Sequence, residues 1–236
     1  MRGELLVALL ACGALGVAGC GSGSVDLVTQ TRTVASCRVD SPGPPAATRA
    51  APGRAVLNTL RTLRRPARPR DKLSVAPLRQ LPVDAVETRY VRLARTVGGT
   101  RYFLVPTMTE PRCGIRMHSP TEQVFLWAVR AHTPSLAVLS GGLAKIRAGI
   151  VLASNSDGAL PNKSQVQALV PSSVVRIQAL YPATGASGRD YGEKTVIQAG
   201  VKNNSVIFDV DRVGIDAIPP RLLWYQRDGT VRRLNP

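Results

Sequence analysis

Short hydrophobic runs separated by turn signals fill the last third of the chain. Four such runs follow one another there: 174–181, 195–201, 205–210 and 222–226. Turns are expected at Asn203-Asn204 and Asp228-Gly229, and prolines are expected to stop strand pairing at Pro182, Pro219 and Pro220. This spacing favours an antiparallel sheet or a small sandwich over a parallel β-α-β sheet.

The middle of the chain contains a hairpin pattern. Residues 89–97 are compatible with a strand, and Gly98-Gly99 is a hairpin turn signal. Residues 102–105 then form the return strand, which Pro106 is expected to end. The pattern predicts one β-hairpin.

An amphipathic helix is predicted over residues 54–65. Val56, Leu57, Leu60 and Leu63 have the spacing of one helical face, and Pro66 is expected to end the helix. The predicted fold is therefore α+β and β-rich, with a short N-terminal helical segment and a hairpin before the antiparallel sheet or sandwich.

Two further helices are predicted between the hairpin and the last third. Ser119-Pro120-Thr121-Glu122 has a cap residue, an early proline and a glutamate, which predicts a helix over 120–131. Val124, Phe125 and Val129 would also suit a strand. A second helix, over 136–147, is interrupted at Gly141-Gly142 and followed by an apolar strand over 150–152.

The first twenty residues have the layout of an export signal. Arg2 precedes an apolar run over 5–17, which is too short for a transmembrane helix of roughly 20 residues. The run leads into Val17-Ala18-Gly19-Cys20, which resembles the lipobox of bacterial lipoproteins. The resemblance implies cleavage before Cys20, acylation of its thiol, and anchoring to the outer face of the cell membrane.

Two cysteines, Cys37 and Cys113, remain after Cys12 leaves with the leader and Cys20 takes the lipid. In an oxidising compartment two remaining cysteines usually pair, so a disulfide is expected. Two inert thiols are the alternative. A zinc pair is excluded because neither a CxxC motif nor a histidine cluster supplies the other ligands.

Composition shifts divide the chain into four parts. A signal peptide is expected over 1–19, a small and polar tether over 20–53, a region with the basic helix and hairpin over 54–132, and a β-rich region over 133–236. The last two parts form either one domain or two.

The charge is strongly positive, with 31 basic and 15 acidic residues and a net charge of +16. Residues 49–101 carry 13 basic and 3 acidic side chains, and this segment therefore holds most of the net positive charge of the chain. The candidate residues for binding an anionic surface are Arg61, Arg64, Arg65, Arg68, Arg70 and Lys72. The alternative is arginine-rich composition bias without a partner. Nucleic acid is not expected as a partner, because the chain is exported and only 4% aromatic.

Several stretches occur in an order that resembles secreted proteins of high-GC Gram-positive bacteria. Residues 60–66 are similar to an "LRRP" helix end, 98–106 to a "GG-x-x-Y-x-L-V-P" hairpin, and 169–174 to an "LVPDGV" turn, here with Ser172-Ser173 in place of Asp-Gly. Asn203-Asn204 and a "D-G-x-V" segment at 228–231 follow. The resemblance implies a secreted architecture and no catalytic residue.

Candidate catalytic chemistry is sparse. His118 and His132 are the only imidazoles, and they lie at opposite ends of the predicted 120–131 helix. Asp209 and Asp211 would face the same way on a strand and could hold a cation, although a solvated strand end explains them more simply. Residues 155–158 fail the ligand spacing of an EF-hand and indicate a turn. No catalytic residue, metal or cofactor is predicted.

Three hypotheses follow. The first is an envelope-anchored lipoprotein that binds or scaffolds without catalysis at anionic lipid or wall polymer. The second is an extracytoplasmic hydrolase that uses His118 or His132. The third is a module that recognises another exported protein through its β-rich region.

Overall fold

The computed structural model describes residues 46–48, 50–74, 78, 81, 83–109, 121–130, 136–156, 163–184, 190–212 and 214–236. All of these residues belong to one compact unit. The leader, Cys20, Cys37, Cys113, His118 and His132 lie outside the described residues.

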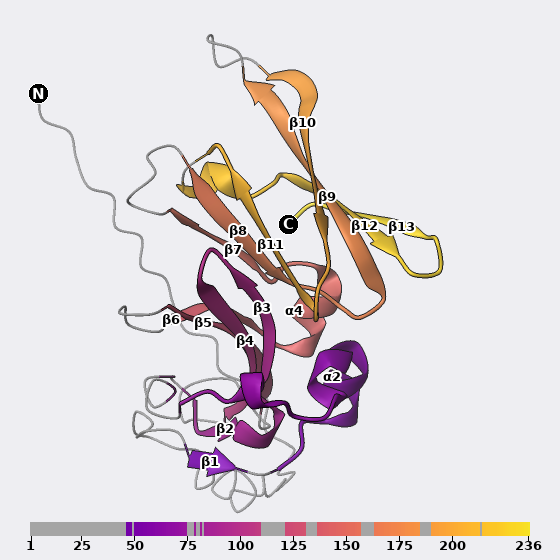
Figure 1. The fold of residues 1–236 in the computed structure, drawn as a ribbon. Helices are drawn as coiled ribbons and strands as arrows, with labels where there is room; N and C mark the ends of the chain where they lie inside the picture. Colours follow the sequence, from indigo (N-terminus) through magenta and orange to yellow (C-terminus); the bar gives the residue numbers. More distant parts are fainter. Residues whose placement is uncertain are drawn as a thin grey trace, which may run out of the picture. The chain divides into compact units, whose positions relative to one another are not determined.

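The fold is β-rich α+β, as the sequence predicts, with mostly antiparallel sheets (Figure 1). The largest sheet has the order β1-β2-β4-β5-β6, with β3 also paired to β4. Its strands are β1 (Ala46–Thr48), β2 (Ala85–Glu87), β3 (Arg92–Val97), β4 (Thr100–Thr109), β5 (Thr121–Val129) and β6 (Leu136–Gly141). The one parallel pair described is β1 with β2, which places Ala46–Thr48 of the expected tether in this sheet.

Two smaller sheets contain the remaining described strands. A four-stranded sheet has the order β10-β9-β12-β13, and a three-stranded sheet has the order β11-β8-β7. Their strands are β7 (Leu152–Ser156), β8 (Ser164–Leu169), β9 (Val174–Thr184), β10 (Asp190–Gly200), β11 (Ser205–Val210), β12 (Arg221–Gln226) and β13 (Val231–Leu234). The four runs predicted in the last third are therefore confirmed as β9 to β12.

Helical structure is short in the described part of the chain. The helices are α2 (Arg54–Thr59) and α4 (Leu143–Ala148), with 3-10 turns η1 (Arg61–Arg64), η2 (Pro69–Asp71), η3 (Thr88–Tyr90) and η4 (Gly214–Ala217). The predicted 54–65 helix is thus split at Leu60 into α2 and η1. Its apolar face is confirmed, because Val56, Leu60 and Leu63 are buried.

The helix predicted over 120–131 is wrong, because this segment is strand β5. Val124 and Leu126 pack into one hydrophobic cluster, while Phe125 and Trp127 pack into another. A strand directs alternate side chains to opposite faces, so it buries all four, whereas a surface helix would expose part of this run. Burial on both faces outweighs the capping signal, and the Glu122 carboxylate instead accepts a hydrogen bond from the Gly53 N–H.

The helix predicted over 136–147 is wrong in its first half, because residues 136–141 form β6. The glycine pair marks the change, since β6 ends at Gly141 and α4 begins after Gly142. β6 completes the sheet beside β5 and thereby covers the edge of a strand that is buried on both faces.

Two prolines expected to end strands lie inside them. Pro106 is part of β4, where pairing with β3 ends at Leu104 and pairing with β2 begins at Thr107. The Met108 carbonyl accepts a hydrogen bond from the Asp84 N–H on the edge of β4 that pairs with β2 and β3. Pro106 turns the same edge as Met108 toward these strands, so its missing N–H lies in the gap between the end of β3 and the start of β2. Pro182 lies in β9 opposite an irregular register of β10, beyond the last residue of β9 that pairs with β12.

Candidate functional site

The residues predicted to bind an anionic surface, within 61–72, lie on and around η1 and η2. Arg61 and Arg64 lie on η1, and the Arg64 guanidinium donates to the Asn58 side chain at 3.2 Å. Arg68, Arg70 and Lys72 are exposed in and beside η2, and the Arg70 backbone carbonyl accepts a hydrogen bond from Arg101 at 2.8 Å. Five of the six predicted cations are therefore exposed, and Arg65 is the exception.

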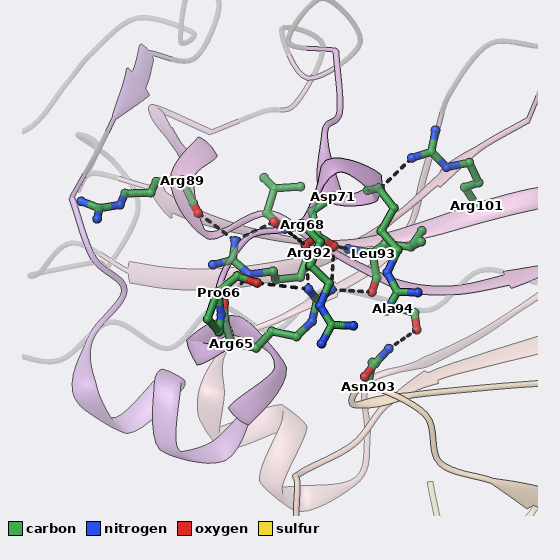
Figure 2. A network of polar contacts seen from close by, with 12 residues as sticks. Arg65, Pro66, Arg68, Asp71, Arg89, Arg92, Leu93, Ala94, Arg101 and Asn203 are labelled. Carbon is green, nitrogen blue, oxygen red and sulfur yellow. Dashed lines mark hydrogen bonds and ion pairs between the residues drawn. The ribbon is translucent and has the colours of Figure 1, made fainter.

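Arg65 is directed inward and holds the segment in place (Figure 2). Its guanidinium donates two hydrogen bonds of 2.6 Å to the two carboxylate oxygens of Asp71 and a third to the Leu93 carbonyl. Asp71, only 5% exposed, also accepts from the backbone N–H groups of Arg68 and Leu93 at 2.8 Å. Arg65 therefore connects the helical segment to β3 and is not part of an anion-binding surface.

The pKa of Asp71 reflects this arrangement. Burial alone raises the pKa, but the hydrogen bonds from Arg65 and from the Leu93 and Arg68 backbone outweigh burial and lower it to about 2. The carboxylate is consequently ionised over the whole neutral range. Arg92 adds to the network by donating to the Arg65 and Arg89 carbonyls.

A second network is centred on Asn204, which is 4% exposed. Its side-chain oxygen accepts from the Thr62 N–H at 3.1 Å, and its amide donates to the Val170 carbonyl and the Ser172 hydroxyl at 2.9 Å. Ser172 in turn accepts from the Arg61 N–H at 2.8 Å. Asn203 and Asn204 both have positive φ, which asparagine tolerates in tight turns, so the predicted turn is confirmed.

These hydrogen bonds bring together stretches that carry the resemblance noted in the sequence. The start of the 60–66 stretch, the turn at 169–174 and the Asn203-Asn204 turn meet at one place. Arg227, the residue before the 228–231 stretch, donates its backbone N–H to the Ser173 carbonyl at 2.8 Å. Residues far apart in the chain thus build one rigid locus.

An open pocket of about 620 Å³ lies at this locus, and we call it the arginine pocket. Four arginines line it, each from a different segment: Arg61 of η1, Arg147 of α4, Arg227 of the β12–β13 turn and Arg232 of β13. The other described lining residues are Asn58, Thr59, Pro171, Ser172, Ser173, Trp224, Gln226 and Asp228.

Two of the four guanidinium groups are fixed by the fold. Arg147 donates from Nε and one terminal nitrogen to the Thr59 hydroxyl, at 3.1 and 3.0 Å. Arg232 donates to the Arg147 carbonyl at 2.8 Å and lies 5.8 Å from the Trp224 ring centroid. The Arg61 and Arg227 side chains have no hydrogen-bond or ion-pair partner within the described part of the chain.

The electrostatics of the arginine pocket favour an anionic ligand. Its one described carboxylate, Asp228, is exposed and has a lowered pKa, chiefly because it accepts hydrogen bonds from the Thr230 hydroxyl and N–H. Guanidinium groups match phosphate and carboxylate oxygens in fork geometry, and the serine hydroxyls add further donors. The arginine pocket therefore has the charge and the hydrogen-bond donors to bind an anion.

The other candidates from the sequence are accounted for as follows. Asp209 accepts from the Gln165 amide at 3.0 Å, and Asp211 lies 3.5 Å from the Lys163 ammonium, so each carboxylate has a separate partner. Within the described ranges no three His, Cys, Asp or Glu side chains come close enough to hold a metal ion. The turn expected at 155–158 lies partly outside those ranges, with Asn155 in β7.

Trp127 and Trp224 belong to the core, with 2% and 3% of their surface exposed, whereas Tyr225 is half-buried. No helix in the described part of the chain combines the length and hydrophobicity needed to cross a membrane. Comparison with known proteins found no matching protein family, curated protein or solved structure.

Sequence reasoning singled out Arg61 but missed Arg147, Arg227 and Arg232. Arg147 is close to Lys145 and Arg232 is next to Arg233, but these basic stretches are short, so a search for the longest charge run does not select any of the three. The one local signal was the order of the resembling stretches, three of which contribute residues to the arginine pocket.

Proposed function

We propose that this protein is an envelope-anchored lipoprotein that binds an anionic polymer of the cell wall, without catalysis, in the arginine pocket. One observation carries the proposal: four guanidinium groups from separate segments line a pocket whose one described carboxylate is already hydrogen-bonded. The leader and the lipobox-like Cys20 support placement on the outer face of the cell membrane.

The shape of the site favours a polymer unit over a flat bilayer. A pocket of about 620 Å³ lies within the range of ligand sites and can hold one or two charged repeat units. A bilayer would present its headgroups mainly to protruding side chains. We therefore favour a phosphate-bearing wall polymer as the ligand and treat anionic membrane as the alternative that the experiment distinguishes.

The test uses the full chain with Cys20→Ser, which prevents acylation. Binding to purified poly(glycerol phosphate) and to vesicles containing phosphatidylglycerol is measured at low and high salt. The test variant is R61Q/R227Q/R232Q, which keeps the long side chains and removes three charges. The matched control is R54Q/K145Q/K202Q, because these three cations are exposed and lie outside the described pocket linings.

We expect the polymer to bind in a salt-sensitive manner, and the test variant to bind at least tenfold more weakly than the control. Charge-assisted hydrogen bonds contribute about 1.5 to 3 kcal/mol each, so three losses exceed this threshold. Equal binding by the two variants would overturn the proposal, as would binding to vesicles alone. Thermal unfolding of both variants shows whether either has lost its fold.

A further inference from the structure

A second pocket, of about 550 Å³, lies beside η2 and is lined by Arg68 and Lys72 among other residues. We call it the leucine pocket. It is lined by residues from the η2 region and from the start of β3: Ala67, Arg68, Pro69, Asp71, Lys72, Leu73, Leu78, Thr88, Arg89, Val91 and Arg92. None of them lines the arginine pocket.

The described lining of this pocket includes a group of apolar side chains. Leu78 and Val91 are 1% and 5% exposed and belong to one of the hydrophobic clusters, against which Leu73 also packs. Leu78 and Val91 are thus almost fully covered, and the accessible apolar lining is that of Ala67, Pro69 and Leu73. A surface of this kind offers a saturated hydrocarbon chain a place outside water.

Three exposed cations line the same pocket. The side chains of Arg68, Lys72 and Arg89 have no hydrogen-bond or ion-pair partner within the described residues. The one described lining carboxylate, Asp71, is already neutralised by Arg65. The pocket therefore combines apolar side chains with uncompensated positive charge.

The pocket is held in shape by the network of Figure 2. Arg92 donates to the carbonyls of Arg89 and Val91 at 2.7 and 2.8 Å, and Asp71 fixes the backbone of Arg68. A preformed site loses little conformational freedom when a ligand binds. The buried charged groups of the lining have partners within the protein: Asp71 pairs with Arg65, and Arg92 donates to backbone carbonyls.

We propose that the leucine pocket binds a single-chain anionic lipid, with the hydrocarbon chain along Ala67, Pro69 and Leu73 and the anionic head at Arg68, Lys72 and Arg89. A wall polymer would leave the apolar lining uncovered, and a neutral lipid would leave the three cations uncompensated. The two parts of the pocket together select an amphiphile with one acidic head. This site goes beyond the proposed function and is independent of it.

The test measures binding of single-chain lipids below their micelle concentration to the full chain with Cys20→Ser. The probes are palmitate, the 16-carbon lysophosphatidylglycerol and the 16-carbon lysophosphatidylcholine, with shorter chains of each. Palmitate and lysophosphatidylglycerol distinguish a carboxylate from a phosphate head. The variants are R68Q/K72Q/R89Q, the matched control R54Q/K145Q/K202Q, and Ala67→Trp, which fills the pocket without removing charge. Every variant keeps residues 1–19, so any lipid binding by the leader is common to all.

We expect an anionic lipid to bind with 1:1 stoichiometry, and each loss of two methylenes to weaken binding a few-fold, because the open pocket covers the chain only in part. R68Q/K72Q/R89Q should weaken binding of the anionic lipid at least tenfold relative to the control and leave the phosphatidylcholine analogue unchanged. Ala67→Trp should abolish binding of both. The proposal is overturned if chain length has no effect, or if the two charge variants bind the anionic lipid equally. Failure of the arginine pocket would leave these results untouched, because the two sets of variants share no residue.

Discussion

The Arg65 guanidinium and the Asp71 carboxylate face each other in a fork, with two hydrogen bonds of 2.6 Å. The side chains are only 17% and 3% exposed, so the pair is shielded from water. Both residues also bond to β3 through Leu93, so the pair attaches the helical segment to the largest sheet.

Removal of one charge of this pair should destabilise the protein strongly. We expect Asp71→Asn to lower the free energy of unfolding by about 3 kcal/mol, because it leaves a largely buried guanidinium without a counter-ion. Urea denaturation measures the change. Asp211→Asn is the control, since that carboxylate is 86% exposed in a surface ion pair and should contribute less than about 0.5 kcal/mol. Similar losses in the two variants would contradict the structural role given to Asp71.

Glu87 should make stability depend on pH near neutrality. Its side chain is 2% exposed, and burial, together with the charge of Glu122, raises its pKa from 4.5 to about 7. The folded state holds this proton more tightly than the unfolded chain, so the stabilisation is complete below pH 4.5 and is lost as the pH rises through 7. We expect up to about 3 kcal/mol less stability at pH 8 than at pH 4.5 from this group. In Glu87→Gln this pH dependence should disappear, and a profile like that of the wild type would refute the assignment.

Asn204 should matter for both the fold and the arginine pocket. We expect Asn204→Gly, which keeps the positive φ accessible, to cost about 2 to 3 kcal/mol, because the Thr62 N–H and the Val170 carbonyl lose a buried partner. Chemical denaturation gives the cost, and binding of poly(glycerol phosphate) should weaken as Arg61 and Ser172 lose their common support. Asn203→Gly is the neighbouring comparison, since Asn203 donates one hydrogen bond, to Ala94. A cost for Asn204→Gly below that of Asn203→Gly would contradict the assigned role.

Two glycines with similar φ offer a test of packing beside the arginine pocket. A Cβ on Gly149 would collide with Leu234 Cδ1 and lie 2.9 Å from Trp224 Cζ2, whereas one on Gly229 would meet no atom within 4 Å. Gly229→Ala should therefore cost only the left-handed backbone penalty of about 1 to 2 kcal/mol, and Gly149→Ala about 1 to 3 kcal/mol more. Thermal unfolding of the two variants measures the difference. Equal costs would mean that Trp224 and Leu234 adjust freely.

The sequence predicts the elements whose signals are local. The hairpin turn at Gly98-Gly99 and strand β11 appear where the hydrophobic alternation and turn residues place them. Strand β5 was missed because its four consecutive apolar residues are buried on two faces, and such a run has no period of its own. The effect of Pro106 was predicted wrongly because a proline is tolerated inside β4 only where neither β2 nor β3 pairs with it. The ends of those two strands are determined by the assembled sheet and are not visible in the local sequence.

The arginine pocket was less accessible to sequence reasoning than the fold. Charge density along the chain pointed to residues 61–72, but Arg65 in that run serves the interior. Arg147, Arg227 and Arg232 come from segments that only tertiary contacts bring beside Arg61. A search along the chain finds clusters of cations, whereas a binding pocket needs cations that cluster in space.

The hydrogen bond from the Thr62 N–H to Asn204 joins residues 142 positions apart. Contacts of such long sequence separation form late and slowly, because closing a long loop costs entropy before any contact compensates it. The 3-10 turn after α2 therefore reaches its final state only when residues near 204 are available to it. In a chain made from its amino end, Thr62 is present long before Asn204. The Asn204 network can therefore form only after nearly all of the chain has been made, so the arginine pocket is among the last parts of the molecule to form.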